Sequence, residues 1–317
     1  MIEAEGISKT RGGTPALDDV SLHVPQGAIH GLIGADGAGK TTLFDILVTL
    51  LRADKGTAVV GGYDTATRWR EVRKTVGYMP AAFSLYGDLS VRENLEFFAR
   101  IYRQPVENIV SLVGDIWRQI EPFADRPAAK LSGGMKQKLA LCCAMIHDPA
   151  VLMLDEPTTG VDPTSRSEFW TALRGLADRG KTVLVSTSYM DEAAKCDCIT
   201  LLHRGTVLDT LAPGQVAGHY RGTLYEIAAA DTAHNTRLLR LLRGWSLSGG
   251  CYSFGDRIHL GMPLPGIRTE TVVSYLRGQG TDTSLISVCP VRPTVEDLFI
   301  QLTSGAETED SLKADNP

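Results

Sequence analysis

The chain has 317 residues, of which 43% are hydrophobic and 22% charged, and its formal net charge is −5. This length predicts one large domain followed by a smaller one. The acidic balance, with no basic tract, argues against nucleic acid as a partner. No apolar run approaches the roughly 18 residues needed to cross a bilayer, and the N-terminus lacks the charged-then-apolar order of a signal peptide. We therefore expect a cytoplasmic protein whose six cysteines are reduced structural thiols.

Short apolar runs alternate with amphipathic helical stretches over the first two hundred residues. Val20, Leu22 and Val24 alternate with polar residues, which predicts an antiparallel layer near the start. Strand-like and helix-like segments then follow one another, which predicts an α/β fold with a largely parallel sheet covered on both faces. The segment from about 85 to 130 is mainly helical and predicts an inserted helical subdomain. The predicted strands are 75–79, 151–154, 182–187 and 199–203, and the predicted helices are 41–51, 92–103, 133–147 and 164–179.

The order of elements changes after about residue 215. It becomes β-α-β-β-α-β, the order of a small α+β ferredoxin-like domain. A final helix, 294–302, begins with Thr294 as its N-cap and has acidic residues in its first turn. The sequence thus predicts a first domain over 1–215, a second over 216–303 and a disordered acidic tail over 304–317. The strands of the second domain are predicted at 223–229, 251–254, 257–261 and 285–291, and its two helices at 234–243 and 269–278.

A glycine-rich stretch follows the apolar run that begins at residue 29 and opens a helical pattern. It matches the P-loop, in which glycines let backbone N–H groups converge on a phosphate and a helix N-terminus adds positive potential. Lys40 is expected to reach the β- and γ-phosphates, and the Thr41 hydroxyl to bind Mg²⁺. The alternative is a glycine-rich turn that binds nothing, which the flanking strand and helix patterns disfavour. The predicted nucleotide-binding residues here are Gly34, Ala35, Asp36, Gly37, Ala38, Gly39, Lys40, Thr41 and Thr42.

Two carboxylates end a second apolar run, VLMLDEP. A buried strand that stops on Asp155 and Glu156 presents both at the carboxyl edge of the sheet, where α/β proteins bind ligands. Asp155 is expected to hold Mg²⁺, directly or through water, and Glu156 to act as general base on the attacking water. Acidic residues are common at strand ends, so this prediction depends on the P-loop beside it.

A second anion-binding helix start is predicted at LSGGM. Ser132 precedes a helical pattern as its N-cap, and the two glycines after it leave the helix N-terminus open to an anion. Because the P-loop already cradles one phosphate, this second cradle indicates a role toward another molecule. The residues of this motif are Leu131, Ser132, Gly133, Gly134, Met135 and Gln137.

The stretch LSGGMKQKLALCCA followed by VLMLDEP resembles the ATP-binding subunit of an ABC transporter, over roughly residues 1–215. In that family two cassettes meet head to tail, and each LSGG caps the ATP held by the other's P-loop. Asp162, in TTGVDP, fits the loop that communicates between the two sites. The region 205–303 is similar to the C-terminal extension of ABC-2-type drug- or antibiotic-export ATPases. The resemblance implies ATP and Mg²⁺ as cofactors, a second cassette and a multi-spanning permease as partners, and a peripheral position on the cytoplasmic face of the cell membrane.

The resemblance also implies a contact with the permease after residue 81. In the family this region cups a helix of the transmembrane subunit. Ser90 is predicted to cap the helix that follows, with Glu93 completing a capping box. Phe83, Leu85 and Tyr86 are candidates for the apolar contact, although residues of an internal core would show the same pattern.

Three positions depart from the family pattern. Ala81 stands where the family has a glutamine that touches Mg²⁺ and the attacking water, and Ser188 stands where it has a histidine that contacts the γ-phosphate. Arg11 stands where the family has an aromatic residue that stacks on adenine; its guanidinium plane could stack instead. Losing one transition-state contact typically costs roughly 10²–10³ in rate. The chain keeps Glu156 and its LSGG face. The hypothesis is a cassette that binds MgATP, hydrolyses it weakly and serves a partner with a complete site; a homodimer working with substituted residues is the alternative.

Other classes of protein remain to be separated from this one. A soluble ABC protein of translation or repair, acting without a permease, is disfavoured by the single cassette and the exporter-like C-terminal region. A nucleotide-binding regulator without hydrolysis is favoured by Ala81 and Ser188 and opposed by Glu156. A P-loop kinase is opposed by LSGGM. A second LSGG, at 247–250, precedes a hairpin pattern and predicts no helix N-terminus.

Overall fold

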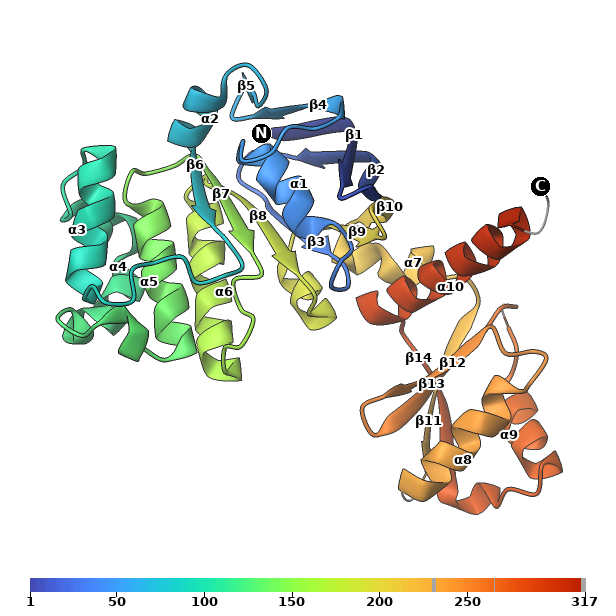
Figure 1. The fold of residues 1–317 in the computed structure, drawn as a ribbon. Coiled ribbons are helices and arrows are strands. Elements are labelled where there is room, and N and C mark those ends of the chain that lie inside the picture. Colours follow the sequence, from blue (N-terminus) through green and yellow to red (C-terminus); the bar gives the residue numbers. More distant parts are fainter. Residues whose placement is uncertain (230–231, 265, 315–317) are drawn as a thin grey trace. The chain divides into compact units, whose positions relative to one another are not determined.

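The computed structural model describes the backbone of residues 1–229, 232–264 and 266–314; the side chains of 232–233, 285 and 305–314 lie outside the description. The chain forms two compact units, Met1–Pro213 and Gly214–Pro317 (Figure 1). This division lies close to the boundary that the sequence predicts after residue 215. Among the described residues, no helix combines the length and apolar character that crossing a bilayer requires.

Unit 1 begins with a four-stranded antiparallel sheet in the order β2-β1-β4-β5. Along β2, Val20, Leu22 and Val24 are buried while the residues between them are exposed. This alternation places one face of the sheet on a core and confirms the predicted antiparallel layer. The strands are β1 (Ile2–Arg11), β2 (Thr14–Val24), β4 (Lys55–Val60) and β5 (Tyr63–Asp64).

A six-stranded sheet in the order β10-β9-β3-β8-β7-β6 forms the centre of unit 1. Its neighbouring strands are parallel from β9 to β6, and β10 pairs antiparallel with β9. Every residue of β3, β7 and β8 is buried, as expected of central strands covered on both faces. The predicted α/β fold is therefore confirmed. The strands are β3 (Ile29–Ile33), β6 (Val76–Met79), β7 (Val151–Asp155), β8 (Thr182–Thr187), β9 (Cys198–His203) and β10 (Thr206–Leu211).

Helix α1 (Lys40–Leu47) lies between the two sheets, because it contacts β2 and β4 of one and β7 of the other. Its buried Leu43, Phe44 and Leu47 join a hydrophobic core that includes residues of both sheets. Helix α6 (Pro163–Asp178) contacts β3 and β8, and α5 (Gly133–Met145) contacts β6. The short helix α2 (Trp69–Thr75) precedes β6.

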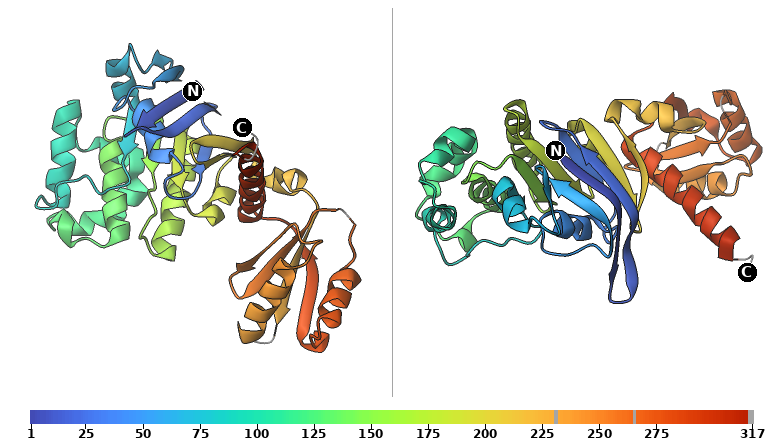
Figure 2. Two further views of the ribbon diagram at one scale, coloured as in Figure 1. Left: turned by 45° about the vertical axis from the view of Figure 1, so that its right-hand side comes forward. Right: turned by 90° about the horizontal axis from the view of Figure 1, so that it is seen from above.

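A group of helices at one end of unit 1 fills the segment predicted to be helical (Figure 2). The Ser90 hydroxyl accepts a hydrogen bond from the Glu93 N–H (3.2 Å), and the Glu93 carboxylate accepts one from the Ser90 N–H (2.8 Å). This is the predicted capping box at the start of α3. The elements are α3 (Val91–Tyr102), α4 (Asn108–Ile120) and 3₁₀ turns at Glu121–Phe123 and Ala128–Lys130.

Unit 2 contains a four-stranded antiparallel sheet in the order β12-β13-β11-β14. Helices α8 and α9 pack on one face, where Tyr225, Leu238 and Leu276 belong to a shared hydrophobic core. The element order and this sheet order are those of the predicted ferredoxin-like domain. The second LSGG leads into the hairpin β12–β13, as predicted. The elements are α7 (Val216–His219), β11 (Thr223–Ala229), α8 (Thr232–Arg243), β12 (Gly250–Phe254), β13 (Arg257–Met262), α9 (Thr269–Gly278) and β14 (Ile286–Val291).

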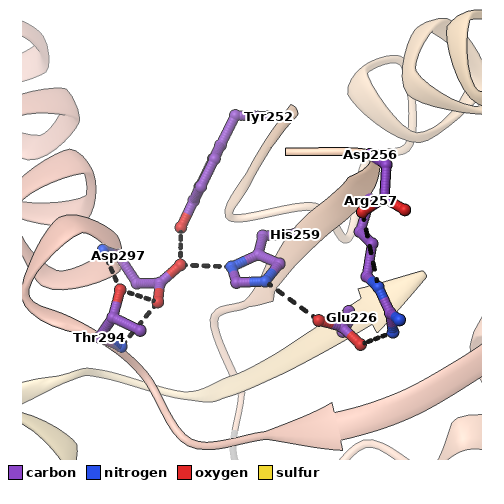
Figure 3. A network of polar contacts seen from close by, with 7 residues as sticks. All are labelled: Glu226, Tyr252, Asp256, Arg257, His259, Thr294 and Asp297. Atoms are coloured by element: carbon purple, nitrogen blue, oxygen red, sulfur yellow. Dashed lines mark hydrogen bonds and ion pairs between the residues drawn. The ribbon is translucent and has the colours of Figure 1, made fainter. Parts of the chain in front are cut away.

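The last helix, α10 (Val295–Ala314), begins against the other face of this sheet. His259 alternates along β13 with core residues and therefore projects from that face. Figure 3 shows Asp297, in the first turn of α10, between His259, the Tyr252 hydroxyl and Thr294. The Asp297 carboxylate is 2.5 Å from His259 Nδ1 and accepts from both the N–H and the hydroxyl of Thr294 (2.6 Å each). In turn, the Asp297 N–H donates to the Thr294 hydroxyl (3.3 Å), which confirms Thr294 as the cap.

The end of α10 differs from the prediction. The helix continues to Ala314, although the sequence predicts a helix end at residue 302 and a disordered tail from residue 304. No proline lies between Thr294 and Pro317, and the added segment contains alanine, glutamate, leucine and lysine, which favour helix continuation. Residues 315–317 lie outside the described residues.

Candidate functional site

The glycine-rich loop joins the end of β3 to the start of α1. Gly37 and Gly39 have φ angles of 78° and 107°, in the left-handed region that favours glycine. A Cβ on Gly39 would lie 2.6 Å from the Ala16 carbonyl oxygen, so no side chain fits there. The loop can therefore pass close to Ala16 of β2 and present backbone N–H groups at the start of α1.

Lys40 is the first residue of α1 and only 4% exposed. Its ammonium group donates to the carbonyl oxygens of Gly34 (2.7 Å) and Ala35 (3.1 Å) and lies 3.0 Å from Glu156 Oε1. Its three contacts hold the cation under the loop, between the loop backbone and the carboxylate that follows β7.

Asp155 ends β7 next to the loop. The Thr41 hydroxyl donates to its Oδ2 (2.8 Å), and the Ser186 hydroxyl, on the neighbouring strand β8, donates to its Oδ1. Burial raises the pKa of Asp155 above its usual value, although these two donors act in the opposite direction. A carboxylate and a hydroxyl supply oxygen ligands, the type that Mg²⁺ takes. The donor set at this point therefore fits the predicted metal.

Glu156 has a φ of 47°, an unusual backbone angle for a residue with a side chain. Its N–H donates to both the hydroxyl (2.9 Å) and the carbonyl oxygen (3.1 Å) of Ser186, and its Oε2 accepts from the Thr159 hydroxyl (3.0 Å). The backbone bonds to β8 hold this strained residue, so its carboxylate lies beside Lys40 at the carboxyl edge of the sheet.

Lys40, Thr41 and Glu156 line one pocket of about 340 Å³, whereas Asp155 contacts Thr41 but does not line the pocket. Ala81, after β6, also reaches it. Arg11 does not line it, because its guanidinium donates to Asp45 on α1 (2.5 Å) and the lining at that end comes from Ala16. The lining residues are Ala16, Asp36, Gly37, Ala38, Gly39, Lys40, Thr41, Thr42, Ala81 and Glu156.

The sequence analysis missed a buried acid behind the pocket. Glu192 is fully buried in a 3₁₀ helix, Met190–Lys195, and accepts hydrogen bonds from the hydroxyls of Thr158 and Thr187 (2.7 Å each). Thr158 lies two residues after Glu156, and Thr187 ends β8 immediately before Ser188. Arg166, on the first turns of α6, lies 3.7 Å from the Glu192 carboxylate. A charged residue within an otherwise ordinary helix pattern gives no signal of this role in the sequence.

The LSGG residues lie outside the P-loop pocket, at the start of α5. The Ser132 hydroxyl accepts from the Met135 N–H (3.3 Å), which confirms the N-cap. A Cβ on Gly134 would lie 2.6 Å from the Ser165 side chain, so α5 approaches the start of α6 closely. Asp162 caps α6 by accepting from the Ser165 N–H (2.9 Å), which also lowers the pKa of Asp162.

Ser132 and Asp162 are both exposed, and the close approach of α5 to α6 at Gly134 brings the two helix starts together at the surface. Gln137 lies one turn further along α5 and lines a different hollow. Its predicted place in the LSGG motif remains a prediction.

That second hollow, of about 330 Å³, lies beside the segment after Ala81. Phe83 and Leu85 line it, and Phe83 is partly exposed. Tyr86 does not line it; its ring packs edge-on against Phe97 of α3 (4.8 Å between centroids). Aromatic and aliphatic side chains of β6, α3 and α5, including Tyr78, Phe98 and Ala144, complete the wall.

A glycine loop between a buried parallel strand and a helix, with two carboxylates at the end of another strand on the same edge of the sheet, defines a P-loop nucleotide-binding protein. The ABC transporter family model matches residues 17–159. The daunorubicin resistance ATP-binding protein DrrA2 of Streptomyces coeruleorubidus is 35% identical over 98% of this chain and 97% of its own length. The chain therefore belongs to the ATP-binding proteins of ABC transporters.

Two further comparisons agree with this family. The probable multidrug ABC transporter ATP-binding protein YbhF of Escherichia coli K12 is 35% identical over 98% of this chain, which spans about half, 53%, of the length of YbhF. A bacterial ABC transporter cassette with a dimeric structure is 25% identical, with a TM-score of 0.61 over 67% of this chain and 98% of its own.

Proposed function

We propose that this chain is the ATP-binding subunit of an ABC-2-type exporter, in which MgATP binding and hydrolysis drive a separate permease. Lys40, Thr41 and Glu156 line one pocket, and Asp155 accepts a hydrogen bond from the Thr41 hydroxyl; this convergence carries the proposal. The similarity to DrrA2, a daunorubicin resistance protein, and to YbhF, a probable multidrug transporter protein, supports export. The permease, and not this chain, would contact the transported substrate.

Each pocket residue has one role in this proposal. The loop N–H groups and Lys40 would hold the β- and γ-phosphates, and Thr41 with Asp155 would hold Mg²⁺, which screens the phosphate charge when it is bound. Glu156 would orient the attacking water and accept its proton. For this, Lys40 would transfer its contact from the Glu156 carboxylate to phosphate oxygens. The Ser186 contacts would keep the Glu156 backbone in place during that exchange.

The site of this chain would hydrolyse ATP weakly. At Ala81 the pocket wall carries only a methyl group, which cannot contact Mg²⁺ or water, and Ser188 is too short to replace a histidine over the γ-phosphate. The exposed start of α5, with Ser132, would cap ATP held by the P-loop of a second cassette, and Asp162 would lie at the same interface. A heterodimer with a complete partner site is favoured over a homodimer.

The second hollow would receive a helix of the permease. Its lining is largely apolar, it adjoins Ala81, and Phe83 stands at its edge. Docking there would link permease movement to the segment that reaches the nucleotide pocket. Such docking would put the chain at the cytoplasmic face of the cell membrane. Recovery with membranes through a multi-spanning protein tests it, whereas purification without any membrane protein would favour a soluble ABC protein.

An ATPase assay on the purified chain, alone and with its partner cassette, tests the division of roles. We expect strong nucleotide binding, weak turnover alone and much faster turnover in the pair. Ser132→Ala should reduce turnover in the pair while leaving ATP binding to this chain intact. Fast turnover by this chain alone, abolished by Glu156→Gln, would refute the weak site and favour the homodimer. Absence of ATP binding would refute the proposed function itself.

A further inference from the structure

A group of cations surrounds an exposed tryptophan on α2. Arg68, Arg70, Arg73 and Lys74 belong to this helix or precede it directly, and Arg52 follows α1; all five are exposed. With Trp69 they form what we call the α2 patch. The segment contains one acid, Glu71, which pairs with Arg68 (3.1 Å). The net charge of the whole chain, −5, gives no sign of this local excess of positive charge. The α2 patch therefore corrects the expectation that the chain has no basic tract.

The geometry of the patch leaves both its ring and its charges accessible. Trp69 is 38% exposed, and the guanidinium carbons of Arg70 and Arg73 lie 4.7 Å and 4.9 Å from its ring centroid. Arg73 also donates to the hydroxyl (2.8 Å) and carbonyl oxygen (3.0 Å) of Thr49, which fixes α2 on the end of α1. A hollow of about 200 Å³ opens between Arg52, Trp69 and Arg73. A phosphate group could enter it between the two cations.

The α2 patch is continuous with the hollow proposed to receive the permease. Arg73 lines both hollows, and Leu50, which is 61% exposed, lines the permease hollow beside it. A permease helix docked in that hollow would bring the α2 patch to the membrane side of the cassette. The inference that follows therefore rests on the proposed function.

We propose that the α2 patch binds anionic phospholipid headgroups of the cytoplasmic leaflet. Guanidinium groups match phosphate oxygens in pairs, and the indole ring of Trp69 suits the boundary between headgroups and acyl chains. A cation near an anionic membrane surface strengthens binding about fivefold. An acidic segment of the permease would match the charges as well, but it would leave the exposed ring of Trp69 without a comparable environment.

Flotation with protein-free vesicles tests this proposal. The full chain is mixed with vesicles of phosphatidylcholine, with or without phosphatidylglycerol, at about 0.15 M salt and again at high salt, where screening is stronger. The test variant is R70Q/K74Q, which avoids the structural bonds of Arg73. The matched control is R237Q/R240Q, which removes two exposed cations from α8 in unit 2. W69A tests the ring alone.

We expect binding only to vesicles with phosphatidylglycerol and its loss at high salt. R70Q/K74Q should bind about 30-fold more weakly, W69A should also bind more weakly, and R237Q/R240Q should bind as the wild type does. Equal losses in the two charge variants would overturn the proposal. The proposal would also be overturned if the wild type did not bind anionic vesicles but bound native membranes, and lost that binding when the membranes were treated with protease. That result would assign the patch to a membrane protein. Binding of a fluorescent ATP analogue by the same samples shows whether a failure concerns the patch or the proposed function.

Discussion

Replacing Asp297 tests whether the start of α10 is fixed by one buried carboxylate. In the wild type this side chain is 1% exposed and has four donors around it, from Tyr252, His259 and Thr294. Asp297→Ala removes all four interactions at once, including the bond from the Thr294 N–H at the start of α10. His259, which also lies 3.8 Å from Glu226, then keeps only its weaker partner.

The expected loss follows from the cost of leaving buried partners unpaired. A buried donor left without its acceptor costs about 1–3 kcal/mol, and three residues lose an acceptor here, so we expect a loss of about 3–5 kcal/mol. A unit of this size is stable by about 5–15 kcal/mol, so the variant loses a large part of the stability of unit 2. Asp297→Asn should lose less, about 2–3 kcal/mol, because the amide oxygen can still accept while its NH₂ group faces donors.

Hydrogen exchange measured on peptides of β13 and α10 gives the local readout. A loss of 3–5 kcal/mol should speed exchange of the best-protected amides by between about 10² and several 10³. Asp256→Ala is the control. Asp256 lies at the edge of the same network, but it is exposed and makes only a weak contact with Arg257, at 3.8 Å. Binding of ATP in unit 1 should be unchanged. Equal exchange in the two variants would refute the role of Asp297.

The same carboxylate predicts a dependence on pH. Burial alone would raise the pKa of Asp297, but donors from Thr294, Tyr252 and His259 hold it below the usual 3.8. Because the folded-state pKa is depressed, the contribution to stability is complete above about pH 4 and is lost as pH falls below it. The wild type should therefore lose protection in α10 on acidification below pH 4, whereas Asp297→Ala should show a smaller change.

Three further substitutions address unit 1. Glu192→Ala leaves the Thr158 and Thr187 hydroxyls without their shared acceptor and should lower the unfolding free energy by about 3–5 kcal/mol in urea titration. Glu192→Gln should recover most of that stability, and a wild-type urea midpoint in Glu192→Ala would count against the network. Gly134→Ala places a Cβ 2.6 Å from the Ser165 side chain, so it should weaken stimulation of a partner cassette without changing ATP affinity of this chain; a matching loss of ATP affinity would contradict the separation of the two faces. Burial, with a smaller effect of His23, lowers the pKa of His30 from 6.5 to about 4. As pH falls from 6.5 to 4, the unfolded chain binds this proton before the folded chain does, so the unfolding free energy should fall by about 3 kcal/mol. Urea midpoints that change equally with pH in the wild type and His30→Asn would exclude His30 as the cause.

Local patterns predicted the elements well where the local sequence decides them. Strand β8 and helix α9 occupy the predicted residues, because a continuous apolar run and an amphipathic repeat each extend over the whole element. Helix α1 instead ends at Leu47, four residues before its predicted end. Thr49 has a φ of 67°, and Arg73, distant in sequence, binds both its oxygens. A helix end fixed by such a contact cannot be read from its own residues.

The candidate site was predictable to the extent that topology brings motifs together. In a parallel sheet, the loop after β3 and the carboxylates after β7 emerge at the same edge, so Lys40 and Glu156 meet without further information. The resemblance to the family predicts that Arg11 takes the position of an adenine-stacking aromatic residue. In the structure its guanidinium group donates to Asp45 on α1. The predicted stacking on adenine remains a prediction, but it requires Arg11 to give up this partner.

Glu192 shows why the remaining part of the site escaped prediction and what it adds. Its partners come from the loop after β7, from the end of β8 and from α6, so only the folded chain reveals a buried acid common to all three. Helix α6 starts at Asp162, on the face proposed to meet a second cassette, and Arg166 lies one turn further along. A shift of α6 on binding a partner would therefore pull on Glu192, and through Thr158 on the segment that carries Glu156. The network would thereby connect the face proposed to meet a second cassette with the P-loop pocket of this chain, even if this chain itself hydrolyses little ATP.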